Sequence, residues 1–282
     1  MKPPPLAYCR PRDLHEALAL LAEHGDEARP LAGGQSLVPM LNHRLARPGV
    51  LVDIGAIGEL QRMERRSSDW LIGATVTQRR VERENVDGCE LLRLAMPFIG
   101  HRQIRARGTV GGSIAHADPA AELPAVALTL DATIVAAGTG GERDIDASSF
   151  FAGPYMNSLD EGEIVTRMTF PVVPATTRCS FREFARRKGD FAVAGVAAAV
   201  DFAGVAVSAA RLTAFAIGSN PVRLAGAEGV IAAHRLDDTA IAAAGAAAAA
   251  EIEPWDDIHG SPQYRRQLIE VLVRRALQDV AP

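Results

Sequence analysis

The chain has 282 residues, of which 48% are hydrophobic and 23% charged, with a formal net charge of −4. This length suits one large domain or two moderate ones, and the composition is typical of a globular protein. The acidic balance excludes a broad nucleic-acid surface, which is normally basic. No stretch is uniformly apolar enough to predict a membrane span, and residues 1–5 lead into no apolar leader segment.

Cys9, Cys89 and Cys179 lie far apart, and no Cys-x-x-Cys pair occurs. This spacing predicts that the chain carries no iron–sulfur cluster and no structural zinc of its own. A sparse, odd set of cysteines fits a reducing cytoplasm, which is the location we predict. We expect no metal site and no catalytic residue, because His116 and Asp118 lack a third partner at a recognisable spacing.

The first part of the chain predicts short helices alternating with strands. Asp13 and Glu16 form a capping box for a helix that Gly25 ends. A short strand then leads into the pair Gly33-Gly34, and a helix follows this predicted turn. The remaining elements predicted in this part are strands over 49–54, 70–74, 133–137 and 163–170, helices over 77–84 and 123–130, and a helix or helical turn over 90–99 that Pro97 limits.

A second glycine pair, Gly111-Gly112, follows the basic segment 101–107. Glycine lets backbone N–H groups face a bound anion, with no Cβ to block the approach. Two glycine turns could therefore hold a diphosphate between them, although neither has the spacing of a dinucleotide fingerprint or a P-loop. Asp118 and Glu122 come next, and a carboxylate at this position suits either a ribose hydroxyl pair or the start of a helix.

The residue pattern changes near residues 171–177, and we predict a domain boundary there, between 1–175 and 176–282. The C-terminal domain predicts an antiparallel sheet followed by helices. Its predicted strands cover residues 180–184, 192–202 and 205–217, and its predicted helices cover 221–234, 238–251 and 264–278. The fold class is therefore α+β.

Two motifs resemble the flavin-binding motifs of the medium subunit of the molybdenum hydroxylases, a family that includes carbon monoxide, xanthine and nicotine-type dehydrogenases. They are Pro-Leu-Ala-Gly-Gly-Gln-Ser-Leu-Val-Pro at 30–39 and Thr-Val-Gly-Gly-Ser-Ile-Ala-His-Ala-Asp-Pro-Ala-Ala-Glu-Leu-Pro at 109–124. Residues 186–192 resemble the Gly-Asp-aromatic-Ala segment of the same family, and the likeness runs through the whole chain. It implies a PCMH-type FAD-binding domain of two α/β subdomains, followed by a small domain with a three-stranded antiparallel sheet and a three-helix bundle.

The resemblance implies that this chain binds FAD. Ile99 and Phe191 would lie near the isoalloxazine ring and Glu122 on the ribose side, with weaker contacts from Val165 and Arg182. The other implied cofactor-binding residues are Ala32, Gly33, Gly34, Gln35, Ser36, Leu37, Thr109, Gly111, Gly112, Ser113 and Asp118. The sequence departs from the family where Ser113 replaces a frequent Asn, Glu122 a frequent Asp, and Phe191 the Tyr of the carbon monoxide enzymes.

The function implied by the resemblance is that of an electron-transfer subunit in a heteromeric molybdenum hydroxylase. Iron–sulfur clusters would lie on a small partner chain and the molybdenum cofactor on a large one, in a dimer of heterotrimers. FAD on this chain would pass the electrons to an external acceptor. Two alternatives are a stand-alone FAD-dependent oxidoreductase and a non-enzymatic nucleotide-binding module; substrate turnover by the isolated chain and the identity of the bound nucleotide distinguish them.

Overall fold

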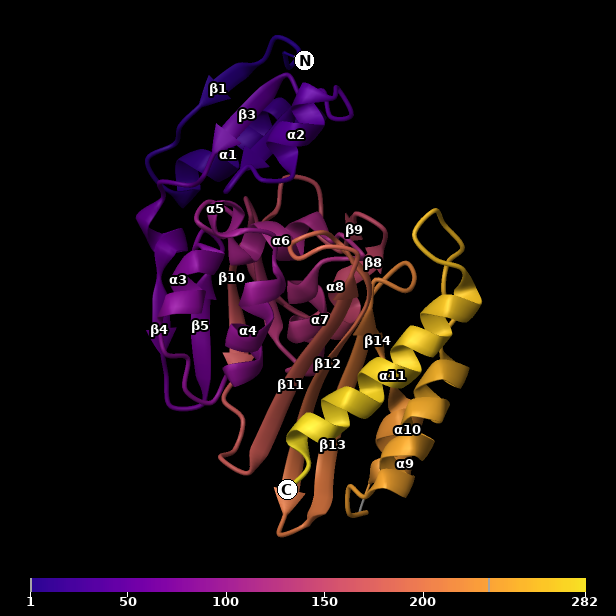
Figure 1. Ribbon diagram of the computed structural model, residues 1–282. Helices are drawn as coiled ribbons and strands as arrows, with labels where there is room; N and C mark the ends of the chain where they lie inside the picture. The colour runs from indigo at the N-terminus through magenta and orange to yellow at the C-terminus, as the bar shows by residue number, and fades with distance from the viewer. Residues whose placement is uncertain (1, 233) are drawn as a thin grey trace.

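A small parallel sheet forms the N-terminal end of the molecule in the computed structural model, which describes residues 2–232 and 234–282. Its strands lie in the order β1-β3-β2. As predicted, Asp13 caps the first helix by accepting a hydrogen bond from the Glu16 N–H at 2.8 Å. The elements here are β1 (Ala7–Cys9), α1 (Leu14–His24), β2 (Ala28–Leu31), α2 (Leu37–Asn42) and β3 (Val50–Asp53). This sheet and its helices stand apart at the top of Figure 1.

The middle of the molecule is built on a five-stranded antiparallel sheet in the order β4-β5-β10-β6-β7. Its strands are β4 (Met63–Arg65), β5 (Asp69–Gly73), β6 (Thr133–Gly138), β7 (Gly141–Asp146) and β10 (Ile164–Pro171). The helices of this part are α3 (Gln78–Arg83), α4 (Glu90–Ala95), α5 (Arg102–Arg105), α6 (Val110–His116), α7 (Glu122–Thr129) and α8 (Ala147–Phe150). A hairpin of β8 (Phe151–Gly153) and β9 (Met156–Asn157) completes it.

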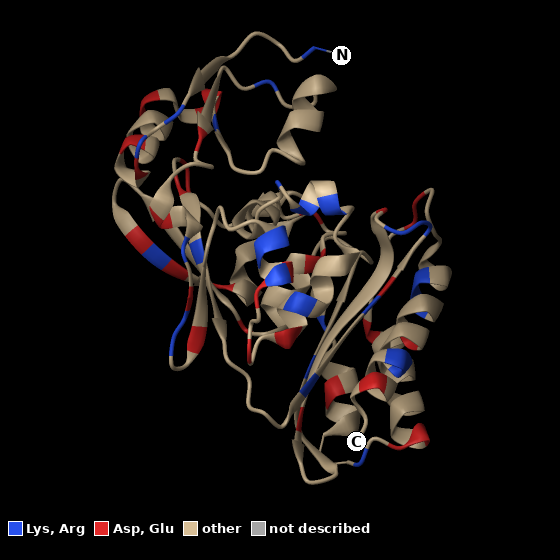
Figure 2. Ribbon diagram, turned by 60° about the vertical axis from the view of Figure 1, so that its left-hand side comes forward, with Lys and Arg blue, Asp and Glu red and all other residues tan. Residues whose placement is uncertain are grey.

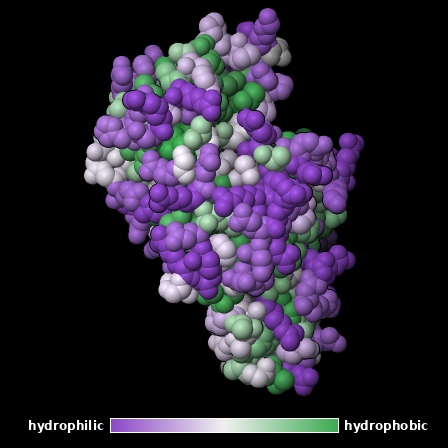
Figure 3. Space-filling model, turned by 90° about the vertical axis from the view of Figure 1, so that its left-hand side faces the viewer, coloured by the Kyte–Doolittle hydropathy of each residue, from purple (hydrophilic) through white to green (hydrophobic). Residues whose placement is uncertain are grey.

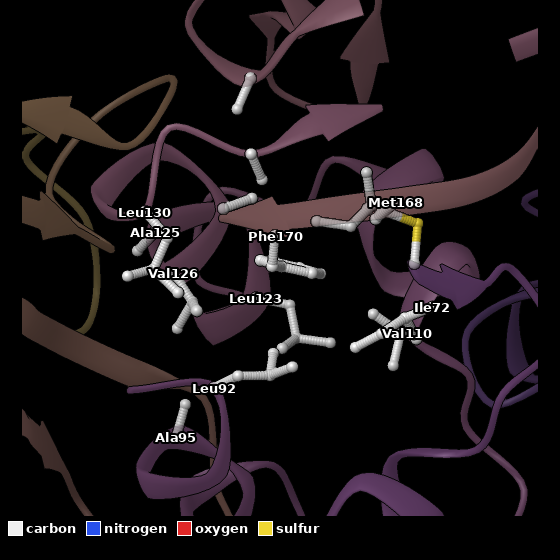
Figure 4. Close-up of a cluster of buried hydrophobic side chains, with 14 of the residues drawn as sticks. Ile72, Leu92, Ala95, Val110, Leu123, Ala125, Val126, Leu130, Met168 and Phe170 are labelled. Carbon is white, nitrogen blue, oxygen red and sulfur yellow. The ribbon is translucent and has the colours of Figure 1, made fainter. Parts of the chain in front are cut away.

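Helix α7 lies at the centre of the main hydrophobic cluster, and all eight of its residues are buried. Figure 4 shows Leu123 and Val126 of this helix facing Phe170 of β10 and Leu92 of α4. Because a fully buried Leu or Phe side chain contributes roughly 1.5–3 kcal/mol, this cluster fixes how the helices lie on the sheet. The cluster therefore also fixes the positions of α6 and α7, the helices that contain most of the second predicted motif.

The C-terminal part is a second antiparallel sheet covered by helices on one face (Figure 1). The elements are β11 (Thr177–Ala185), β12 (Ala192–Ala203), β13 (Ala206–Phe215), β14 (Val222–Arg223), α9 (Ala225–Ile231), α10 (Asp238–Glu251) and α11 (Pro262–Val280). Along β12, Val196 and Val200 pack against these helices, whereas Ala197 and Ala199 belong to the cluster around α7. Since successive side chains of a strand point to opposite faces, this strand is buried on both.

The predicted α+β class is confirmed, with differences in detail. The segment predicted as one helix over 221–234 begins with β14, because Val222 and Arg223 pair with β13, and α9 starts at Ala225. The predicted turn at Gly111 is the first turn of α6. Pro97 ends α4 early, and a short 3₁₀ turn (Met96–Phe98) replaces the last turn of the predicted helix.

The surface carries charges of both signs, scattered over all three parts of the molecule (Figure 2). The face that carries α3 and β4 is mostly hydrophilic, and apolar side chains show there only as small separate patches (Figure 3). Among the helices of the described residues, none combines the length and the apolar character needed to cross a membrane.

Candidate cofactor-binding site

A cleft of about 1190 Å³ lies between the N-terminal sheet and the middle of the molecule. Ligand sites in proteins usually occupy about 300–1,000 Å³, so this cleft suits a large ligand. The two predicted motifs lie close together beside it: the backbone of Arg107, just before the second motif, fills the space of a side chain at Gly33, and a Cβ at Gly112 would lie 3.8 Å from the Cβ of Ala32. It is lined by Ala32, Gly33, Gly34, Gln35, Ser36, Leu37, Ile99, Thr109, Gly111, Gly112, Ser113, Asp118, Glu122, Val165 and Phe191, among others.

The loop between β2 and α2 presents backbone donors to this cleft. Among the hydrogen bonds of the described residues, none has a backbone N–H group of residues 33–37 as its donor, and Val38 is the first backbone donor, to the Gly34 carbonyl oxygen at 3.0 Å. Gly34 has a φ of 73°, a conformation that glycine adopts without strain. A row of free N–H groups in such a concave loop is suited to an anion such as a phosphate.

The second glycine segment is arranged differently, because its backbone donors are already used. Val110 donates to the Val76 carbonyl oxygen at 2.9 Å and Gly111 to that of Ala74 at 3.0 Å. The Gly112 N–H donates to the Thr109 hydroxyl, which caps α6, at 3.0 Å. Gly111 is needed for packing, since a Cβ there would lie 2.5 Å from the Cα of Ala74.

Gln78, the first residue of α3, also lines the cleft, although the sequence analysis did not single it out. Its side chain is 4% exposed, and its Oε1 atom has no hydrogen-bond partner among the described residues. A buried acceptor without a donor is costly, so this oxygen is suited to an N–H or O–H group of a ligand. A glutamine after a helix cap carries no sequence signal that would have identified it.

The acidic residues of the second motif lie at the inner wall of the cleft. Asp118 accepts a hydrogen bond from the Ala120 N–H at 2.9 Å, and Glu122 begins α7. Burial lowers the pKa of His116, although the carboxylate of Asp118 acts in the opposite direction. His116 is therefore neutral near pH 7. Within the described ranges, no three or more His, Cys, Asp or Glu side chains are grouped so that they could hold a metal ion.

The β8–β9 hairpin forms another wall that the sequence analysis missed. The Tyr155 N–H donates to the Ala117 carbonyl oxygen at 2.9 Å, and the Asn157 side-chain amide donates to that of Ala115 at 2.7 Å. The rings of Tyr155 and His116 are 5.1 Å apart. These bonds fix the hairpin to the end of α6, so that a polar edge with an aromatic ring borders the cleft.

The two residues predicted near the ring system lie in contrasting surroundings. Ile99 is buried in the wall of the cleft, whereas Phe191 is 73% exposed at its rim. The loop before Phe191 lies against the middle of the molecule, because a Cβ on Gly189 would lie 2.6 Å from the His101 ring. An exposed aromatic ring at the rim of a cleft offers a stacking surface to a planar ligand.

Arg182 is the one predicted contact that the structure does not bring into the cleft. It lies on β11 and donates from Nε to the Asp279 carboxylate of α11 at 2.6 Å. This ion pair holds the pKa of Asp279 below its usual range. Arg182 therefore links the C-terminal sheet to its covering helix.

The residues that line the cleft fit the demands of FAD. The free N–H groups of the first loop suit its diphosphate, and the unpartnered Gln78 oxygen suits a donor of the cofactor. Ile99 and Phe191 offer apolar surface for a planar ring. No Lys or Arg side chain is required to neutralise the phosphates, because backbone N–H groups perform this role in many phosphate sites.

Comparison with protein families matches nearly the whole chain. Residues 4–173 match the FAD binding domain in molybdopterin dehydrogenase, and residues 179–280 match the CO dehydrogenase flavoprotein C-terminal domain. A subunit of the 6-hydroxypseudooxynicotine dehydrogenase complex of Paenarthrobacter nicotinovorans is 40% identical over 98% of this chain and 95% of its own length. The carbon monoxide dehydrogenase medium chain of Hydrogenophaga pseudoflava is 35% identical over 98% and 97%.

Solved structures agree with these sequence relatives. Carbon monoxide dehydrogenase from Hydrogenophaga pseudoflava contains a chain that superposes with a TM-score of 0.96 at 34% identity, covering 99% of this chain and 98% of that one. Quinoline 2-oxidoreductase from Pseudomonas putida 86 gives a TM-score of 0.94 at 35% identity, with the same coverage. Both similarities therefore extend over nearly the whole length of the two chains compared.

Proposed function

Because this chain belongs to the family of FAD-binding medium subunits of molybdenum hydroxylases, we propose that its cleft holds FAD for an electron-transfer role in such a complex. The chain is an oxidoreductase subunit, and FAD is its cofactor. The bound cofactor supplies the redox chemistry, and the protein supplies its orientation and surroundings. The observation that supports FAD in this cleft is that the backbone N–H groups of residues 33–37, which line it, have no hydrogen-bond acceptor among the described residues.

The residues of this chain would bind and orient the cofactor in distinct ways. The loop over 33–37 would donate hydrogen bonds to the diphosphate, and Gln78 would accept one from a donor of the cofactor. Thr109, Ser113 and Asp118 would shape the wall beside the ribityl and ribose parts. Ile99 and Val165 would exclude water, while Phe191 would cover an edge of the ring system.

The medium chain works within a multi-subunit complex. We propose that its partners are a small iron–sulfur subunit and a large molybdopterin subunit, assembled as a dimer of heterotrimers in the cytoplasm. Electrons would then reach this chain from the clusters and leave to an external acceptor. Its own cysteines, Cys9, Cys89 and Cys179, are all free, and burial raises the pKa of Cys179 to about 12, so this thiol is inert.

Reconstitution of the purified chain tests the cofactor assignment. The apo chain is titrated with FAD, and binding is followed by the change in flavin fluorescence, with ATP as the competing nucleotide. We expect one FAD per chain and no displacement by ATP. A folded chain that takes up no FAD, alone or when co-expressed with its partners, would contradict the proposal.

A further inference from the structure

Two acidic residues near the inner wall of the cleft have no cationic partner among the described residues. Glu122 is 7% exposed at the start of α7 and lines the cleft. Glu183 lies on β11, and its Oε2 atom is buried without a hydrogen-bond partner. Within the described residues, neither carboxyl group takes part in an ion pair, although many other acidic side chains do.

Apart from the backbone N–H of Glu122 itself, which lowers its pKa, the elements around Glu122 offer little to stabilise a negative charge. Arg105 of α5 is the cation that acts on it, but Arg105 is bound to Glu82 at 2.9 Å and to the Ile99 carbonyl oxygen at 3.0 Å. Asp118 adds a second negative charge, and His116 is neutral. Burial raises the pKa of the Tyr155 phenol, and the charge of the nearby Asp118 adds to this rise.

Glu183, on β11, has apolar groups as its neighbours in the sheet. Phe181 shares its face of β11, and the rings of Phe181 and Phe98 are 5.2 Å apart. Opposite Glu183 in the sheet is Gly195, where the ring of Phe215 fills the space of a side chain. Burial of a carboxylate in such surroundings is unfavourable, and a carboxyl group there keeps its proton instead.

Both groups accordingly hold their protons at higher pH than usual. Burial raises the pKa of Glu122 to about 7, against the opposing effect of its own backbone N–H, and the charge of Asp118 adds to the rise. Burial and the charge of Glu122 raise the pKa of Glu183 to about 8. Glu122 therefore loses its proton first, and its charge then opposes ionisation of Glu183.

We propose that Glu122 contacts the bound FAD as a neutral carboxylic acid, which donates its O–H to an acceptor atom of the cofactor. This inference rests on the proposed function, since it assumes FAD in the cleft. It reverses the role expected of a carboxylate on a ribose, which would accept hydrogen bonds from hydroxyl groups. A protonated carboxyl group has one donor, and a glutamine amide in its place retains a donor.

The dissociation constant of FAD as a function of pH tests this role. For the wild-type chain we expect binding to weaken about tenfold or more between about pH 6 and about pH 9, because the required proton is lost. Glu122→Gln should bind within about threefold of wild type at about pH 6 and lose most of this pH dependence. Glu64→Gln, which changes an exposed carboxyl group on β4, should keep the wild-type profile.

Two outcomes would overturn the inference while leaving FAD binding intact. One is a wild-type affinity that does not change with pH. The other is a Glu122→Gln variant that binds FAD more than about tenfold more weakly at about pH 6, as loss of a carboxylate acceptor predicts. A folded wild-type chain that binds no FAD at any pH would instead contradict the proposed function.

Infrared spectroscopy of the wild-type chain is a second test of the protonated carboxyl group, and it does not require that a variant folds. The wild-type holo chain should show the C=O stretch of a protonated carboxyl group near neutral pH, and this band should disappear as the pH rises above the range of the two groups. Absence of the band at neutral pH would overturn the inference. Loss of part of the band in Glu122→Gln would assign it to that residue.

Discussion

The two glycine pairs of this chain have similar sequences but serve different physical purposes. Around Gly33-Gly34 the backbone N–H groups donate no hydrogen bond within the described residues, and these residues line the cleft. Around Gly111-Gly112 the N–H groups are bound within the protein, and the missing side chain of Gly111 makes room for the backbone of Ala74. One pair is arranged to bind a ligand, and the other to hold the wall of its site together.

This difference shows that a glycine pair near a cofactor is not by itself evidence of contact through backbone donors. The same residue type allows close approach either to a ligand or to another part of the chain. Variants at the two pairs should therefore separate loss of folding stability from loss of cofactor affinity.

Gly111→Ala should destabilise the apo chain by about 3 kcal/mol, because its Cβ would lie 2.5 Å from the Cα of Ala74, a backbone atom that cannot swing aside. Urea unfolding without FAD measures this effect. The control is Gly140→Ala, where a Cβ would meet nothing within 4 Å, and its stability should change by less than about 0.5 kcal/mol. Equal stabilities of the two variants would contradict the packing role of Gly111.

Gly34→Ala should mainly weaken FAD binding, by about tenfold, or about 1.4 kcal/mol. The φ of 73° at Gly34 is unfavourable for alanine by about 1–2 kcal/mol. In the apo chain the loop can relax, since its N–H groups are not tied to the protein, so the strain arises when the cofactor orders the loop. Fluorescence titration and urea unfolding of the same variant measure both effects; a loss confined to apo stability would remove the contrast between the pairs.

Gln78→Met should weaken FAD binding by several-fold, on the order of 1 kcal/mol, while leaving the apo chain as stable as before. The substitution removes a buried oxygen that has no partner within the protein. Thr75→Val is a matched control, because the Thr75 hydroxyl is also buried and unpartnered but does not line the cleft. If both variants bind FAD like the wild type, Gln78 does not contact the cofactor.

The sequence predicts the buried elements of this fold better than the exposed ones. The continuous apolar run of β12 predicted a strand over 192–202, and the structure has one over Ala192–Ala203, because burial on both faces removes the need for alternation. The strand β7 (Gly141–Asp146) was missed, since Glu142, Arg143 and Asp144 are polar residues at an exposed edge. Its structure comes from pairing with β6, a tertiary contact that local patterns do not record.

The same distinction applies to the candidate site. The glycine motifs and the acids that follow them could be found from sequence because they are local and similar to a known family. Gln78 and Tyr155 could not, because they reach the cleft through the placement of α3 and of a hairpin. Arg182 illustrates the converse, since its neighbour Asp279 is distant in sequence and turns it away from the cleft.

The two-sided burial of β12 has a consequence for how the molecule comes apart. Its side chains alternate between the hydrophobic cluster that contains α7 and the one beneath α10 and α11, so neither cluster is closed without this strand. The family models divide the chain after residue 173, but the packing does not divide there. We expect heating to unfold the middle and C-terminal parts in one cooperative transition. The inner wall of the cofactor cleft should therefore be lost together with the C-terminal helices.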